Sequence, residues 1–163
     1  MKELLLNYLS YNLWANKRIC DFLQTVEEEK LSREVTSSFS SIKKTCAHVL
    51  GAETIWMMRL YGTSPSAPPV NVEEMSIAEI ATLWLNKSQE IISYAESKTE
   101  NQLEEMLPYK NIAGQSFTSS IRDILQHVVN HGTYHRGQIV TMLRQSGHTK
   151  LFPTDYIVFC REK

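Results

Sequence analysis

Four long stretches of the chain place an apolar residue every three or four positions, which is the spacing of one face of an α-helix. They cover about residues 2–25, about 40–61, a segment that opens at Ser76 and reaches Ala95, and about 119–146. Amphipathic helices of one chain bury their apolar faces against one another, so the pattern predicts an all-α four-helix bundle. The length suits a single domain spanning residues 1–163, with a core that needs no disulfides.

Residues at the helix ends support these boundaries. The sequence Ser76-Ile-Ala-Glu79 is a capping-box signature, Gly and Pro residues in segment 62–69 end the second helix, and Gly147 is the expected end of the fourth. The predicted core positions are Leu5, Leu9, Leu13, Ile19 and Leu23 on the first helix, Ile42, Cys46, Val49, Trp56 and Leu60 on the second, and Ile77, Ile80, Trp84, Ile91 and Ala95 on the third.

The connections are less regular than the helices. Residues 27–34 are rich in charge and are predicted to form a solvated connection. In residues 103–118, apolar side chains alternate loosely around Asn111 and Gly114, which favours a short hairpin or an ordered loop between the third and fourth helices. Residues 156–160 are apolar and follow Pro153, so we expect an extended tail that folds back onto the bundle.

Charge and cysteine content exclude several classes of protein. The 17 basic residues nearly balance the 18 acidic ones, so the chain has neither the basic footprint of a nucleic-acid-binding protein nor a polybasic membrane patch. No apolar run approaches the length of a membrane span. The three cysteines are widely spaced and form no CxxC pair, which argues against a disulfide framework and favours the reducing cytoplasm.

The fourth helix carries histidines at every fourth position, namely His127, His131 and His135. Side chains at i and i+4 lie one above the other, and two such imidazoles can hold one metal ion at about 2.0–2.1 Å. The outer pair is about 12 Å apart along the axis and cannot share an ion. His135 lies about 30° from the centre of the apolar stripe, His131 about 70° and His127 about 110°. The predicted pair is therefore His131 and His135, with His127 a boundary residue near the site.

Two glycines interrupt the same helix, each at a cost of about 1 kcal/mol relative to Ala. Gly132 and Gly137 flank the histidines, where room for a ligand or a neighbouring helix would matter. The motif is not HExxH, and the chain contains no Glu-x-x-His pair, so neither a metalloprotease base nor a di-iron bundle is predicted. From these residues alone, core or boundary histidines with polar partners remain the alternative to a metal site.

A metal site needs at least one more ligand. His148 follows Gly147, beyond the helix, and is predicted to be a surface residue. His48 lies at one edge of the broad apolar arc of the second helix, while Glu53 lies nearer its centre. Glu53 is thus either a ligand candidate or a buried acid that needs a partner, and the periodicity leaves both candidates open.

Several segments together resemble the DinB/YfiT-like superfamily over essentially the whole chain. They are Tyr11-Asn-Leu-Trp-Ala-Asn16, Cys46-Ala-His48, Gly51-Ala-Glu53, Trp56, Asn130-His-Gly-Thr-Tyr-His-Arg-Gly-Gln-Ile139 and Pro153-Thr-Asp-Tyr156. The resemblance implies a four-helix bundle that holds a divalent metal, zinc or nickel, through His48, His131 and His135. It also implies a homodimer.

Three protein ligands leave a coordination position open, as in catalytic rather than structural zinc sites. Relatives in the family include transferases that use bacillithiol or mycothiol, so the resemblance suggests a metal-dependent thiol S-transferase or an isomerase with a small-molecule thiol as partner. The chain has no cysteine in a catalytic motif, so the sulfur would come from a cosubstrate. Arg136, next to His135, is expected to form a structural salt bridge. The alternatives are a metal-dependent hydrolase and a non-enzymatic, metal-stabilised bundle that binds a partner.

Overall fold

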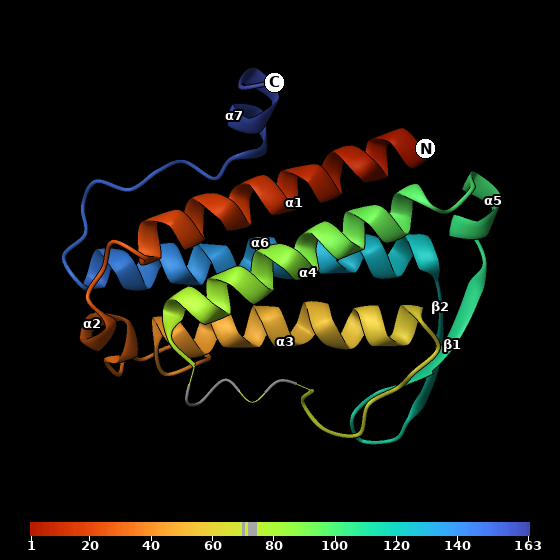
Figure 1. Ribbon diagram of the computed structural model, residues 1–163, viewed down its shortest axis with the longest axis horizontal. Helices are drawn as coiled ribbons and strands as arrows, with labels where there is room; N and C mark the ends of the chain where they lie inside the picture. The colour runs from red at the N-terminus through yellow and green to blue at the C-terminus, as the bar shows by residue number, and fades with distance from the viewer. Residues whose placement is uncertain (70, 72–74) are drawn as a thin grey trace.

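Four long helices lie side by side and form the body of the protein in the computed structural model, which describes residues 1–69, 71 and 75–163 (Figure 1). They are α1 (Lys2–Leu23), α3 (Ile42–Leu60), α4 (Ile77–Glu96) and α6 (Ile121–Gln145). Helices α1 and α3 each pack against both α4 and α6. The predicted all-α bundle is confirmed, and so is the hairpin between its last two long helices.

Local sequence sets the helix ends as expected. Ser76 accepts a hydrogen bond from the Glu79 N–H, and the Glu79 carboxylate accepts one from the Ser76 N–H, which completes the capping box. Ser41 and Ser120 cap α3 and α6 in the same way, with side chains that accept from the third helical N–H. Helix α6 ends before Gly147, whose φ of +92° suits glycine.

The hairpin lies at one end of the bundle (Figure 1). Strands β1 (Met106–Lys110) and β2 (Ser116–Ser120) are antiparallel, with Tyr109 opposite Phe117. The turn between them is closed by hydrogen bonds between Asn111 and Gln115, and Gly114 has a φ of +83°.

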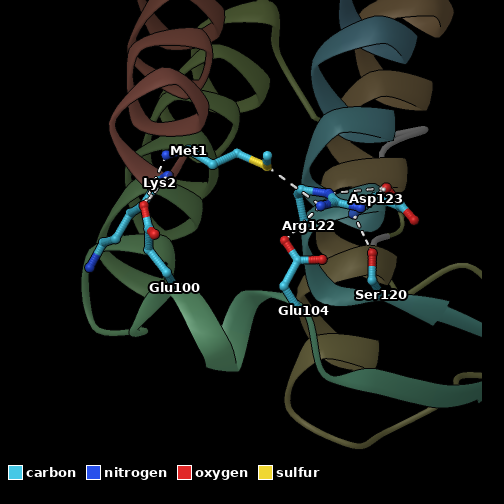
Figure 2. Close-up of polar contacts among 7 residues, drawn as sticks. All are labelled: Met1, Lys2, Glu100, Glu104, Ser120, Arg122 and Asp123. Atoms are coloured by element: carbon cyan, nitrogen blue, oxygen red, sulfur yellow. Dashed lines mark hydrogen bonds and ion pairs between the residues drawn. The ribbon is translucent and has the colours of Figure 1, made fainter.

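The N-terminus is tied to the same end of the bundle. The Met1 ammonium donates to Glu100 at 2.9 Å, and Glu100 belongs to the short helix α5 (Glu100–Leu103). Arg122, in the first turn of α6, donates to Glu104 at 2.6 Å and lies beside the Met1 side chain (Figure 2). These contacts join α1, α5 and α6 where the hairpin begins.

Two predicted connections are right only in part, since residues 27–34 are mostly exposed, as expected. Residues 27–34 contain a one-turn helix, α2 (Glu28–Ser32), because the fully buried Leu31 anchors it to the core and Lys43 forms an ion pair with Glu28 at 2.8 Å. The tail is not extended, since residues Tyr156–Arg161 form helix α7. It does fold back as expected, and Phe159 packs against Tyr11 and Trp14 of α1.

The core faces are confirmed at most positions and differ at a few. Leu13 and Trp56 are only partly buried, whereas Asn12 and Asn16 of α1 are buried. These two amides lie on the core face because they hydrogen-bond to charged groups from other helices, which an apolar pattern does not register. Within the described residues, no helix is long and apolar enough to cross a membrane.

Candidate metal centre

Helices α3 and α6 bring three histidines together, although His48 is separated by 83 residues from His131. His131 Nε2 lies 3.1 Å from His48 Nε2 and 3.1 Å from His135 Nε2. The three candidate ligand atoms all lie within 4.8 Å of one another. His135 is buried, while His48 and His131 are partly exposed, so the cluster sits at the edge of the core.

This donor set fits a divalent transition metal. Nitrogens bound at about 2.0–2.1 Å in a tetrahedral site lie roughly 3.3 Å apart, close to the spacing of the two short pairs. Imidazole nitrogens suit zinc and nickel alike, and no carboxylate joins the cluster among the described residues. The cluster could therefore hold one metal ion through three neutral imidazoles.

Neighbouring side chains fix the orientation of the rings. Gln138 Oε1, which can only accept, lies 2.8 Å from His135 Nδ1, so the ring proton sits on Nδ1 and the Nε2 lone pair faces the cluster. Gln138 in turn donates to Ser38 at 3.1 Å. The Phe39 ring stacks on His48 at 4.1 Å. The sequence pattern gave no signal for Phe39. Gln138 was not predicted either, although it lies about one turn beyond His135 on the same helix.

The environment favours the neutral form of His48 and His131. Burial lowers the pKa of His48 from 6.5 to about 4, with a further contribution from the positive charge that His135 can carry. Burial also lowers the pKa of His131 to about 3, and the three nearby histidines add to the effect. Because only neutral imidazole binds a metal, these shifts prepare the cluster for a cation near neutral pH.

A cavity of about 690 Å³ opens beside His48. Its lining is largely apolar and comes from α3, the segments before and after it and the hairpin turn. The lining residues include Phe39, Ala47, Ala52, Ile55, Pro68 and Ile112, together with Lys43 and Lys44. A volume of this size can admit a small organic molecule. A second groove, lined by Leu4, Tyr8 and Asn130 among others, is separate from the histidine cluster.

Of the two alternatives for Glu53, a metal ligand or a buried acid with partners, the structure shows the buried acid. Glu53 is not part of the histidine cluster. Its carboxylate accepts hydrogen bonds from Asn12 at 3.1 Å, Asn16 at 3.2 Å and Ser88 at 2.7 Å. The Trp84 indole N–H donates to it as well, at 3.3 Å. Burial raises its pKa, and these hydrogen bonds act in the opposite direction.

Arg136 is buried beside this acid but does not form the expected salt bridge. Its Nη1 donates at 2.6 Å to the side-chain oxygens of both Asn12 and Asn16, which connect it to Glu53. We call these four residues, Glu53, Asn12, Asn16 and Arg136, the buried polar network.

Gly132 makes room for the buried polar network, because a Cβ there would lie 2.7 Å from Asn12 Oδ1 and 2.8 Å from Arg136 Nη1. Gly137 has nothing within 4 Å of its would-be Cβ.

The other two histidines, His127 and His148, are not members of the cluster. His127 is near the cluster, as predicted, with its ring 5.7 Å from that of His131 and 5.2 Å from Trp56. Partial burial and the charge of Arg59 lower its pKa. His148 is not a simple surface residue, because its ring packs edge-on against Phe22 at 5.6 Å.

Known proteins resemble this chain over nearly its whole length. The profile of the DinB family matches residues 1–162. The Protein DinB of Bacillus subtilis is 32% identical over 163 residues, which cover 96% of this chain and 93% of that protein.

Solved structures show the same fold. A dinb-like protein from Bacillus subtilis superposes with a TM-score of 0.70, covering 91% of this chain and 97% of that one at 18% identity. A second, from Bacillus cereus, gives a TM-score of 0.66 and covers 88% and 91%, again at 18% identity. With a family profile that spans nearly the whole sequence, the chain belongs to the DinB family.

Proposed function

We propose that the protein is a metal-dependent thiol S-transferase that holds zinc or nickel through His48, His131 and His135. The observation that carries the proposal is the convergence of three imidazoles, one of which, His48, lines a largely apolar cavity. The reaction would join a thiol to an electrophile, forming a carbon–sulfur bond while the thiol proton and the leaving group depart. A bound divalent ion would supply the positive charge that lowers the pKa of a coordinated thiol.

The chain's own residues prepare the site for this chemistry. Gln138 and Phe39 hold the His135 and His48 rings in place, so the site is arranged before substrate arrives. The cavity's apolar lining would receive the hydrophobic part of the electrophile and exclude water from it.

The protein's own cysteines are unsuited to act as the nucleophile. Burial raises the pKa of Cys20 to about 12 and that of Cys46 well above its usual value, so both remain thiols near neutral pH. Cys160 lies on α7, which packs against α1. These positions support a sulfur donor that comes from solution, such as bacillithiol, mycothiol or glutathione.

The test begins with metal content. Untagged protein should contain about one divalent ion per chain, and His135→Ala should lose it. His127→Ala is the matched control, because it removes an imidazole from the same helix that lies outside the cluster. Full metal content in His135→Ala would overturn the assignment.

The second step measures the reaction. Metal-loaded protein is incubated with each thiol and monochlorobimane, and conjugation should exceed the uncatalysed rate. The gain should vanish in His48→Ala and His131→Ala but persist in His127→Ala. No acceleration by fully metallated protein with any thiol and several electrophiles would favour the non-enzymatic alternative, a metal-stabilised bundle.

A homodimer is part of the same proposal. Exposed apolar side chains of α1, Met1, Leu4 and Tyr8, border a groove of about 540 Å³ against α6 and offer a surface for a second copy. Light scattering at micromolar concentration should give twice 18.8 kDa. A monomer mass would rule the dimer out without affecting the metal proposal.

A further inference from the structure

Arg59 is a buried cation without an acceptor. Only 7% of the residue is exposed, yet it makes no hydrogen bond or ion pair with any residue that the structure describes, and its Nε is fully enclosed without a partner. Arg136, the other buried arginine in the described residues, also has an enclosed Nε without a partner, but its terminal nitrogens have three oxygen acceptors, whereas those of Arg59 have none. An enclosed Nε that lacks an acceptor costs free energy, and the two terminal NH₂ groups, which also have no acceptor among the described residues, remain available to a ligand.

Two aromatic rings hold the Arg59 guanidinium in place. Its Cζ lies 4.4 Å from the centre of the Trp56 ring and 5.2 Å from that of Tyr109, on strand β1. Of its three nitrogens only Nε is enclosed, so the two terminal NH₂ groups reach the surface. The two terminal NH₂ groups of a guanidinium form a planar fork of donors, which is the arrangement that binds carboxylate or phosphate through two hydrogen bonds.

Arg59 shares a face of α3 with the candidate metal ligand His48. At 100° per residue, His48, Ala52, Ile55 and Arg59 fall within an arc of about 60°. The first three line the cavity beside the histidines. Arg59 is not itself a lining residue of that cavity, but helical side chains lean toward the N-terminus, so it lies over the turn of α3 that contains Ile55, on the side away from His48. About 10 Å of helix axis separates His48 from Ile55.

We propose that Arg59 binds the oxyanion, a carboxylate or phosphate, of an elongated substrate whose other end lies at the three histidines. The substrate class is therefore amphipathic: an anionic group, an apolar middle over Ala52 and Ile55, and a metal-binding atom roughly 10 Å away. The anion subsite is argued from Arg59 alone, whereas the role of the far end rests on the proposed thiol chemistry.

The first experiment observes Arg59 directly and requires no activity. Arginine Nε–H signals of ¹⁵N-labelled, metal-free protein are followed by NMR during titration with octanoate and, separately, octyl phosphate. The Arg59 signal, identified by its loss in Arg59→Lys, should shift with one or both anions and not with octanol. An Arg59 signal that responds to neither anion overturns the proposal.

The second experiment measures the energetic contribution of the anion. Cobalt-loaded protein is titrated with 8-mercaptooctanoate and with 8-mercaptooctanol, using the thiolate-to-cobalt absorption band. The acid should bind about ten- to a hundredfold more tightly than the alcohol, as expected for charge-assisted hydrogen bonds. That preference should be lost in Arg59→Gln.

Arg18→Gln is the matched control. Arg18 also lies over a tryptophan, 4.8 Å from the Trp14 ring centre, but it is paired with Glu162, so its loss should leave the preference unchanged. Equal binding of acid and alcohol by the wild type would overturn the proposal. If neither thiol gives the band, the thiol function fails, and the NMR titration still decides whether Arg59 binds an anion.

Discussion

Helices α3 and α6 build two polar clusters from neighbouring positions, and the two differ in how their atoms are satisfied. In the buried polar network, Glu53 is 1% exposed and has four hydrogen-bond donors, while Arg136 is equally buried and has three acceptors. In the histidine cluster, three Nε2 atoms face one another, with no oppositely charged group among the described residues.

The comparison shows how a polar network that stabilises the fold differs from a polar cluster that is arranged to bind a ligand. A network in which the Glu53 carboxylate and the terminal nitrogens of Arg136 all have partners makes the helix packing specific, although Arg136 Nε has none. Three converging imidazole nitrogens suit a metal cation, and one of them, from His48, belongs to a residue that lines a cavity from which a ligand can arrive. Consecutive residues such as His135 and Arg136 serve different clusters because one step along a helix turns the side chain by about 100°.

The largest effect is expected from opening the buried network. Glu53→Ala removes the acceptor of four donors and leaves Arg136 without a nearby negative charge, so we expect a loss of about 3–5 kcal/mol in the free energy of unfolding. Urea denaturation measures it. Glu53→Gln should lose less, since it keeps one acceptor oxygen. If Glu53→Ala kept the stability of the wild type but lost its metal, Glu53 would instead belong to the metal site.

Metal removal should have the next largest effect. A ligand that binds only the folded state at a hundred times its Kd adds about 2.7 kcal/mol to the stability. Chelation should therefore lower the Tm of the wild type and of His127→Ala, but not that of His131→Ala. If verified metal removal leaves the wild-type Tm unchanged, the cluster does not contribute to stability through a metal.

The two glycines of α6 offer a matched pair of smaller effects. Gly132→Ala forces its Cβ against Asn12 and Arg136, so we expect a loss of about 1–3 kcal/mol. Gly137→Ala meets open space and should gain up to about 1 kcal/mol from helix propensity. Equal effects in urea denaturation would contradict the packing role of Gly132 in the network.

The smallest expected effect is on the pH dependence of the stability of the metal-free protein. The pKa values of His48 and His131 are lowered to about 4 and about 3, so the unfolded chain binds more protons than the folded one below pH 6.5. The cluster's contribution to stability is fully present above pH 6.5 and is lost as the pH falls toward 4 and 3. His131→Ala should flatten this decline in Tm, whereas His148→Ala should not. An identical profile in both variants would contradict the assignment.

The sequence alone determined the bundle, because 3.6-residue periodicity, the capping box at Ser76 and the break at Gly147 are local signals. The stripe on the last helix also separated His131 and His135 from His127, since rotation about one helix axis follows from residue number. His48 came from the family resemblance, because its own periodicity was ambiguous.

Only the tertiary structure decided how groups from different helices meet. It placed Glu53 among amides of α1 rather than with the histidines, bridged Arg136 to it through Asn12 and Asn16, and left Arg59 without an acceptor. It also turned residues 156–161 into a helix that packs on α1. Each of these depends on distances across helix interfaces, which are set by packing between segments far apart in the chain, and a single sequence carries no measure of them.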